Sequence, residues 1–279
     1  MRGEEAAVDQ HTTDIAAIGG EILAATDVAA SIVPFSARGA ELSARDAYRV
    51  SHWVERARHA RGETAVGRKI GFTNRNIWAE YNVYAPNWGY VTTRSVRELA
   101  ATPVLPLAPY AEPRIEPEIM FGLSRAPAPD MDEAALIGCI AWVAHGYEIV
   151  QSIFPQWKFT ATDTTAANAL HGSLIVGARQ PIGRDAAEWL RRLATFEIAL
   201  YRDGQLIDRG RGDNALGSPL SALRHLVGLL ADDPVNPPLK AGEIVSTGTV
   251  TRAFPVAPGE TWTTELTGIP LPGARLRFA

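Results

Sequence analysis

Cysteine is almost absent from this sequence, since Cys139 is the only one among 279 residues. A single thiol excludes an intramolecular disulfide and any metal site built from several cysteines. Cys139 lies in the apolar stretch 136–142, which predicts a buried and unreactive side chain. One buried thiol is compatible with a reducing compartment, and we expect a cytoplasmic protein.

Long apolar runs and an excess of positive charge are also missing. No apolar stretch approaches the ~20 residues of a membrane-spanning helix, and the N-terminal residues are acidic rather than basic, so we expect neither a membrane span nor a secretory signal. The 31 acidic and 27 basic side chains give a net charge of −4. Without a basic field we expect neither a nucleic-acid nor a membrane partner.

The first third of the chain has apolar residues at helical spacing. This pattern predicts one helix within residues 14–33 and another after Ser43, where Ser43 and Asp46 form a variant of the capping box. Gly62 is expected to end the second helix. We therefore predict a helical N-terminal region over residues 1–66.

From residue 67 onward, short β-type runs alternate with turn residues, and Asp203-Gly204 predicts a hairpin turn. The strands neither alternate strictly with helices nor follow a sandwich rhythm. The pattern therefore predicts an α+β fold with a large, mostly antiparallel or mixed sheet region, in one compact unit over residues 67–279. The expected strands are 69–73, 89–93, 115–121, 147–150, 174–176, 196–201 and 244–250, and the expected helices are 131–143 and 219–230.

Carboxylates form the most informative pattern. In a strand, Glu116 and Glu118 point to the same face, within an otherwise apolar segment. Two adjacent buried carboxylates need a positive group between them, and a divalent cation such as magnesium or manganese suits oxygen ligands. The alternative is an exposed edge strand, which Pro117 favours because it donates no hydrogen bond. Glu148, in another apolar run, needs either the same metal or a structural salt bridge.

Two basic side chains are further candidates. Lys69 is one of only three lysines and lies between glycines in a β-type run. It could bind a carboxylate or act as a catalytic residue in proton transfer, and the alternative is an ordinary surface lysine. His171 lies in a glycine-containing loop, where a structural role is the alternative to catalysis. The glycines near Lys69 match no phosphate-binding loop, and no Gly-x-Ser-x-Gly segment is present.

Several segments in the same order resemble the hydratase and decarboxylase branch of the fumarylacetoacetate hydrolase superfamily, from about Ser43 to the C-terminus. That branch includes 2-keto-4-pentenoate hydratase and 4-oxalocrotonate decarboxylase. The resemblance implies an α+β fold with a helical N-terminal part and a mixed β-sandwich or roll. The matching segments are 67–73, 86–89, 114–121, Glu148 with 157–158, 163–177 and 239–249.

By this resemblance, Glu116, Glu118 and Glu148 match the carboxylates that bind Mg²⁺ or Mn²⁺, and Lys69 matches the lysine beside the substrate carboxylate. The implied ligand is a small 2-oxo acid, chelated through its carboxylate and 2-oxygen. Leu170 and Thr249 fall in segments expected to bind this substrate. The resemblance also favours a homo-oligomer.

The sequence departs from the family where the reacting carbons are expected. Asn87 replaces the catalytic acid of the hydratases, and an amide cannot act as an acid or base near neutral pH. Residues 151–153 are Gln-Ser-Ile where the family has Asp-Ser-Arg. In the loop 168–171, Leu170 and His171 replace two serines, so we expect His171 to face the cavity and carry the proton.

The leading hypothesis is a metal-dependent lyase that hydrates a small 2-hydroxy-dienoic or unsaturated 2-oxo acid. A decarboxylase acting on a 2-oxo-enedioate is the nearest alternative. A binding or biosynthetic protein without hydratase activity belongs to a different class. A carbon–carbon hydrolase would need a His–Glu pair; His52 and Glu55 are spaced one helical turn apart, but nothing else in the sequence supports this alternative.

Overall fold

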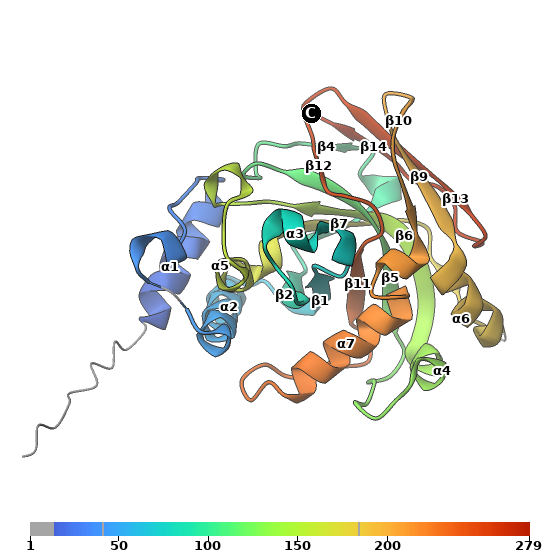
Figure 1. The fold of residues 1–279 in the computed structure, drawn as a ribbon, viewed down its shortest axis with the longest axis horizontal. Helices are drawn as coiled ribbons and strands as arrows, with labels where there is room; N and C mark the ends of the chain where they lie inside the picture. Colours follow the sequence, from blue (N-terminus) through green and yellow to red (C-terminus); the bar gives the residue numbers. More distant parts are fainter. Residues whose placement is uncertain (1–13, 41, 184) are drawn as a thin grey trace, which may run out of the picture.

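The computed structural model describes residues 14–40, 42–183 and 185–279, so the first 13 residues of the expected N-terminal region lie outside it. Two packed helices begin the described chain, α1 (Ile15–Asp27) and α2 (Ala44–Ala60), and they lie at one end of the molecule (Figure 1). The Ser43 hydroxyl accepts a hydrogen bond from the Asp46 amide, which confirms the predicted start of α2. The first helix ends earlier than expected, because Ala29 has a left-handed backbone.

A nine-stranded mixed sheet occupies the centre, with its main path in the order β2-β1-β11-β5-β6-β7-β3. The β1–β11 and β3–β7 pairs are parallel, whereas the pairs around β5 and β6 are antiparallel, which confirms the predicted mixed sheet. The strands are β1 (Ala65–Gly71), β2 (Asn87–Thr92), β3 (Val96–Glu98), β5 (Arg114–Leu123), β6 (Ile140–Val150), β7 (His171–Val176), β8 (Gln180–Pro181), β11 (Ile244–Thr249) and β12 (Phe254–Pro255).

A smaller sheet in the order β10-β9-β13-β14-β4 lies at the end opposite the N-terminal helices (Figure 1). Asp203 and Gly204 have positive φ angles and turn the chain between β9 and β10, as the Asp-Gly pair predicted. An apolar cluster that includes Tyr147 and Trp262 packs the two sheets together. The strands are β4 (Val104–Leu105), β9 (Glu197–Arg202), β10 (Gln205–Arg211), β13 (Thr261–Thr267) and β14 (Arg275–Phe278).

The prediction of a helix over residues 131–143 is wrong for the second half of that range. Only Glu133–Leu136 forms an α-helix, α4, and the chain enters β6 at Ile140. An apolar run of this length suits a helix or a buried strand equally well, and pairing with β5 decides in favour of the strand. By contrast, the expected helix over 219–230 is confirmed as α7 (Pro219–Ala231). The remaining helices are α3 (Trp78–Tyr81), α5 (Ala161–Ala166) and α6 (Ala186–Thr195).

The largest apolar cluster lies between the main sheet and helices α6 and α7. It joins sheet residues such as Ile70, Ile119 and Val245 to Leu193 and Leu226 on the helices. One face of the sheet is therefore fixed in place by packing, which gives its strands the rigidity that a site needs. Among the described residues, no helix combines the length and apolar character needed to cross a membrane.

Candidate metal centre

Neighbouring strands bring three glutamates to one point in the main sheet. Glu116 and Glu118 project from the same face of β5, and Glu116 pairs directly with Glu148 of β6. All three side chains are buried, and one possible ligand atom from each lies within 4.8 Å of the others. The alternative of an exposed edge strand is therefore wrong, because β5 lies between β11 and β6.

Pro117 is tolerated at this central position because of an irregularity in the neighbouring strand. The Pro117 carbonyl accepts a hydrogen bond from the Val250 amide, so its nitrogen also faces the β11 side. The pairing of β5 with β11 changes register between Ser246 and Thr249, opposite this point. A proline without an amide proton fits at such a break in the ladder.

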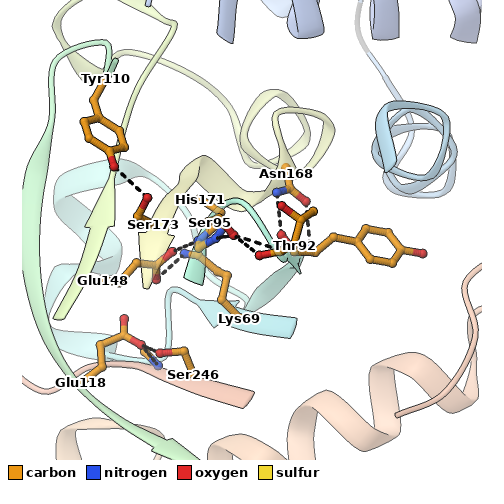
Figure 2. A network of polar contacts seen from close by, with 12 residues as sticks. Lys69, Thr92, Ser95, Tyr110, Glu118, Glu148, Asn168, His171, Ser173 and Ser246 are labelled. Carbon is orange, nitrogen blue, oxygen red and sulfur yellow. Dashed lines mark hydrogen bonds and ion pairs between the residues drawn. The ribbon is translucent and has the colours of Figure 1, made fainter. Parts of the chain in front are cut away.

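Two of the carboxylate oxygens have no hydrogen-bond partner in the described part of the chain. Glu118 Oε2 accepts hydrogen bonds from Ser246 Oγ and from the Gly248 amide, at 3.0 Å for the latter. Glu148 Oε1 lies 2.7 Å from His171 Nδ1. Glu118 Oε1 and Glu148 Oε2 are buried and accept no well-aligned hydrogen bond, although Lys69 Nζ lies 3.3 Å from the latter oxygen (Figure 2).

The electrostatics of the cluster call for a further positive charge. Burial raises the pKa of each of the three carboxyl groups, that of Glu118 to about 8. Burial alone would lower the pKa of Lys69, but the charges of Glu148, Glu116 and Glu118 outweigh it and raise that pKa. If all three carboxyl groups are ionised, as metal ligands are, their charge exceeds that of the single Lys69 ammonium by two, and a divalent cation would balance this excess. Together with the unsatisfied oxygens, this all-oxygen donor set fits a hard divalent cation.

A cavity opens beside the glutamates, with about 450 Å³ of empty space including its mouth. Lys69, Glu116, Leu170 and Thr249 all line it, so four predicted site residues meet there. The structure places Lys69 inside the sheet rather than on the surface. The remaining wall is formed by Gly71, Phe72, Thr73, Ile77, Tyr81, Val150, Trp157, Ala169, Gly248 and Ala253.

His171 does not line this cavity, contrary to the expectation that its imidazole faces the metal site. It begins β7 and lies behind Glu148, with Nε2 2.8 Å from Ser95 Oγ (Figure 2). Burial and the nearby charges of Lys69 and Arg58 hold the pKa of His171 well below its usual value. The ring is thus a neutral group packed against the rear of a candidate ligand.

Asn87 lies close to Gly71, a residue of the cavity wall, where a side chain larger than that of glycine would not fit. Its amide nitrogen donates to Thr164 Oγ1 and Thr165 Oγ1, at 3.0 and 3.2 Å. Its Oδ1 is buried and accepts no hydrogen bond. A Cβ at Gly71 would lie 2.8 Å from this oxygen and 3.1 Å from Lys69 Nζ, so both polar atoms face the same corner.

A family model described as Fumarylacetoacetate (FAA) hydrolase C-terminal matches residues 79–276, which is more than half of the chain. The chain belongs to the fumarylacetoacetate hydrolase family. Its His52 lies on α2 with Nδ1 3.5 Å from the Tyr90 hydroxyl, and it does not line the cavity. The His–Glu pair considered for a hydrolase is therefore not part of this site.

Relatives place this family member in the branch of hydratases and decarboxylases. It is 30% identical over 245 residues to 2-hydroxyhexa-2,4-dienoate hydratase of Comamonas testosteroni, covering 87% of this chain and 89% of the relative. It is 28% identical over 234 residues to 4-oxalocrotonate decarboxylase of Pseudomonas sp. strain CF600, covering 82% and 84%. The solved 4-oxalocrotonate decarboxylase from Pseudomonas putida G7, complexed with magnesium and adipate, superposes with a TM-score of 0.85 at 26% identity, over 95% and 97% of the two chains.

Thr73, Tyr81 and Trp157 are the residues of this family member's cavity wall with polar side-chain atoms that were not predicted as site residues. Thr73 lies in the loop after β1 and Tyr81 ends the short helix α3, and local sequence gives no sign that this segment lines a cavity with Glu116. Thr73 Oγ1 is buried without a hydrogen-bond partner. Trp157 belongs to a matching segment of the family, but its type alone indicates only burial.

Proposed function

We propose that this protein is a divalent-metal-dependent lyase that hydrates a small 2-hydroxy-dienoic acid. The observation that carries the proposal is the buried cluster of Glu116, Glu118 and Glu148, in which two oxygens have no hydrogen-bond partner among the described residues. Glu116 and Lys69 line the adjoining cavity. A cavity lined by one ammonium suits a small acid with one carboxylate.

In this proposal the three glutamates hold Mg²⁺ or Mn²⁺. Bound there, the cation would stabilise negative charge on the 2-oxygen of the substrate, which is the charge that develops in hydration and decarboxylation alike. Glu118 is held in its orientation by Ser246 and Gly248, so its second oxygen remains free for the metal.

Lys69 binds the carboxylate of the substrate in this proposal. Its raised pKa keeps the ammonium charged at neutral pH, and its burial excludes competing water. A hydrogen bond between an ammonium and a carboxylate is stronger than a neutral one. The unpaired Thr73 hydroxyl and Thr249 supply neutral polar contacts on the cavity wall.

We assign His171 a positioning role instead of a catalytic one. An ionised Glu148 only accepts hydrogen bonds, so His171 Nδ1 donates its proton to Oε1, and Nε2 is left as an acceptor 2.8 Å from Ser95 Oγ. This fixes the Glu148 carboxylate with Oε2 toward Lys69. In this proposal Asn87 presents its unpaired Oδ1 to the space next to Gly71, which Lys69 Nζ also faces.

The lining of the cavity favours hydration over decarboxylation of a dicarboxylic acid. Among the described residues, Lys69 is the only cation that lines it, and Phe72, Ile77, Trp157 and Leu170 contribute apolar side chains to the wall. A second carboxylate would find no ammonium or guanidinium directly in this wall. An acid with one carboxylate and an uncharged tail matches the lining better.

The test is incubation of the protein with 2-hydroxypenta-2,4-dienoate and Mg²⁺ or Mn²⁺, following loss of the dienol absorbance. The Glu118→Gln variant is the control for background tautomerisation. A 2-oxo-enedioate assayed for release of carbon dioxide tests the decarboxylase alternative. Binding of either acid without turnover would indicate a binding protein and contradict the proposal.

A further inference from the structure

Tyr81 is a rigidly held aromatic residue in the wall of the cavity. It is the last residue of α3, and its ring stacks on Phe159 with centroids 6.0 Å apart and an interplanar angle of 7°. Phe72 and Trp157 pack edge-on against the same ring, at 6.0 and 6.3 Å. These three contacts fix the direction of the Tyr81 hydroxyl, so it is preorganised instead of mobile.

The Tyr81 hydroxyl accepts a hydrogen bond but donates none to the described residues. Arg114 Nη1 donates a hydrogen bond of 2.6 Å to the Tyr81 oxygen, and no group among the described residues accepts a hydrogen bond from the hydroxyl. The Arg114 guanidinium lies 4.2 Å from the Trp157 ring centroid and has no carboxylate within ion-pair distance in the described chain. An unpaired cation is therefore directed at the phenol oxygen.

The charge state of Tyr81 suits a proton donor. Burial raises its pKa to about 12, which keeps the proton on the phenol but makes it a weaker acid than a free tyrosine, and the guanidinium of Arg114 opposes this rise. The phenol is therefore protonated at neutral pH. When it gives up its proton, the Arg114 cation is already in place to stabilise the phenolate, without reorganisation.

Other groups near the cavity are less suited to this task. The Asn87 amide has no proton to give near neutral pH, and His171 lies outside the cavity. Lys69 is held by the carboxylates. Thr73 and Thr249 have hydroxyls that are far weaker acids than a phenol.

We infer that Tyr81 is the catalytic residue that delivers a proton to the terminal carbon of the dienoic substrate, with Arg114 as its positioning residue. This inference rests on the proposed function and identifies the acid that the hydratase frame lacks at Asn87. General acid catalysis of this kind contributes about 10²–10⁴ to a rate.

The proposed step transfers protons and shifts double bonds, with no oxidation or reduction. The O–H bond of Tyr81 breaks, and a C–H bond forms at the terminal carbon with the electron pair of the terminal double bond. The remaining double bond shifts by one position, and the 2-hydroxyl proton leaves to water as the 2-oxo group forms. Water then returns a proton to the phenolate, so the net change is isomerisation of the dienol to a 2-oxo-enoic acid.

The experiment compares Tyr81→Phe with Tyr84→Phe, a matched variant at an exposed tyrosine outside the cavity. In D₂O with Mg²⁺, NMR follows deuterium uptake at the terminal carbon of 2-hydroxypenta-2,4-dienoate. Tyr81→Phe should reduce this uptake and dienol loss by roughly 100-fold or more. Tyr84→Phe should leave both unchanged, and binding of unreactive 2-oxopentanoate, measured by calorimetry, should change less than about threefold in either variant.

A second substitution separates acid catalysis from support of the fold. Fluorotyrosines at position 81 keep the ring and hydroxyl while making the phenol more acidic, so the rate of deuterium uptake should change systematically with fluorination. A rate independent of phenol acidity, or full activity of Tyr81→Phe, overturns the role of Tyr81 alone. Failure of the unmodified protein to consume the dienoic acid with Mg²⁺ or Mn²⁺ overturns the proposed function and this inference together.

Discussion

His171 Nδ1 lies 2.7 Å from Glu148 Oε1, and both side chains are buried at the junction of β6 and β7. The pairing of these strands places the imidazole behind the carboxylate, and Ser95 holds the other ring nitrogen. A histidine that donates to a ligand carboxylate fixes the ligand's orientation and can tune its affinity for a metal. The pair therefore connects the rear of the candidate metal centre to the sheet.

Replacing His171 should change metal binding more than proton transfer. We expect His171→Asn to weaken Mn²⁺ affinity about 10–100-fold, the usual effect of losing such a supporting partner. Turnover at saturating metal should keep the same pH profile between pH 5 and 9. Calorimetric titration and a pH–rate series test this, with His59→Asn, at an exposed position of α2, as the matched control. Normal metal affinity with an altered pH profile would favour the proton carrier that the sequence predicted.

Removing one carboxylate should separate metal binding from stability. Glu118→Gln should abolish measurable Mg²⁺ stabilisation, because it removes a charged ligand. Burial raises the pKa of Glu118 to about 8 from an unfolded value of 4.5, so the wild-type folded state loses stability as pH rises between these values. Without metal, Glu118→Gln should therefore melt higher than wild type at pH 8, by roughly 5 °C, and show little such advantage near pH 4.5.

Thermal melts with and without Mg²⁺ measure both effects of Glu118→Gln. Glu21→Gln, at a surface position paired with Arg38, is the control for a general effect of removing a carboxylate. Retained Mg²⁺ stabilisation in Glu118→Gln would contradict the proposed ligand set.

Lys69 should contribute to substrate binding more than to the folded state once metal is bound. Lys69→Ala leaves three carboxylates without their ammonium, so the metal-free variant should be strongly destabilised. At saturating Mg²⁺ we expect only a few degrees of loss in Tm, but about 10–100-fold weaker binding of 2-oxopentanoate, consistent with a lost hydrogen bond between charged groups. Lys240→Ala, at an exposed position, is the control. Equal losses of binding and stability would make Lys69 structural.

The alternation of side chains in a strand was sufficient to predict that Glu116 and Glu118 share a face. It could not predict that Glu116 lies opposite Glu148, because that depends on the register of two strands joined by a long connection. The residues before Glu148 were expected to form a helix, since an apolar run does not distinguish helix from buried strand. The local pattern left the role of Glu148 open, and the family resemblance assigned it to the metal site.

The cavity wall was harder to predict because its members come from unrelated segments. Tyr81 ends a single helical turn that returns over the sheet, and no periodicity indicates such a return. His171 was expected in the cavity because of its place in a loop, but it is the first residue of β7 and its side chain points behind Glu148. Side-chain direction at the end of a strand depends on register, which a single sequence does not fix.

His145 gives a prediction for acid stability. Its Nδ1 lies 3.0 Å from the Glu118 carbonyl, which only accepts, so Nδ1 carries the proton and Nε2 accepts from the Thr264 hydroxyl at 2.7 Å. This neutral ring joins β6 to β13 of the smaller sheet. Burial lowers its pKa from 6.5 to about 4, since protonation would remove the acceptor and place a charge in the core.

The sign of this shift predicts when the protein loses stability. His145 binds a proton near pH 6.5 in the unfolded chain but only near pH 4 in the folded chain. Its contribution to the free energy of unfolding is therefore complete above pH 6.5 and is lost as pH falls from 6.5 to 4. The shift corresponds to about 3 kcal/mol. Urea unfolding at pH 7 and pH 4 should show that His145→Asn, although less stable at pH 7, loses about 3 kcal/mol less on acidification than wild type. His59→Asn should follow wild type, and equal acid sensitivity of His145→Asn and wild type would show that His145 does not govern this loss.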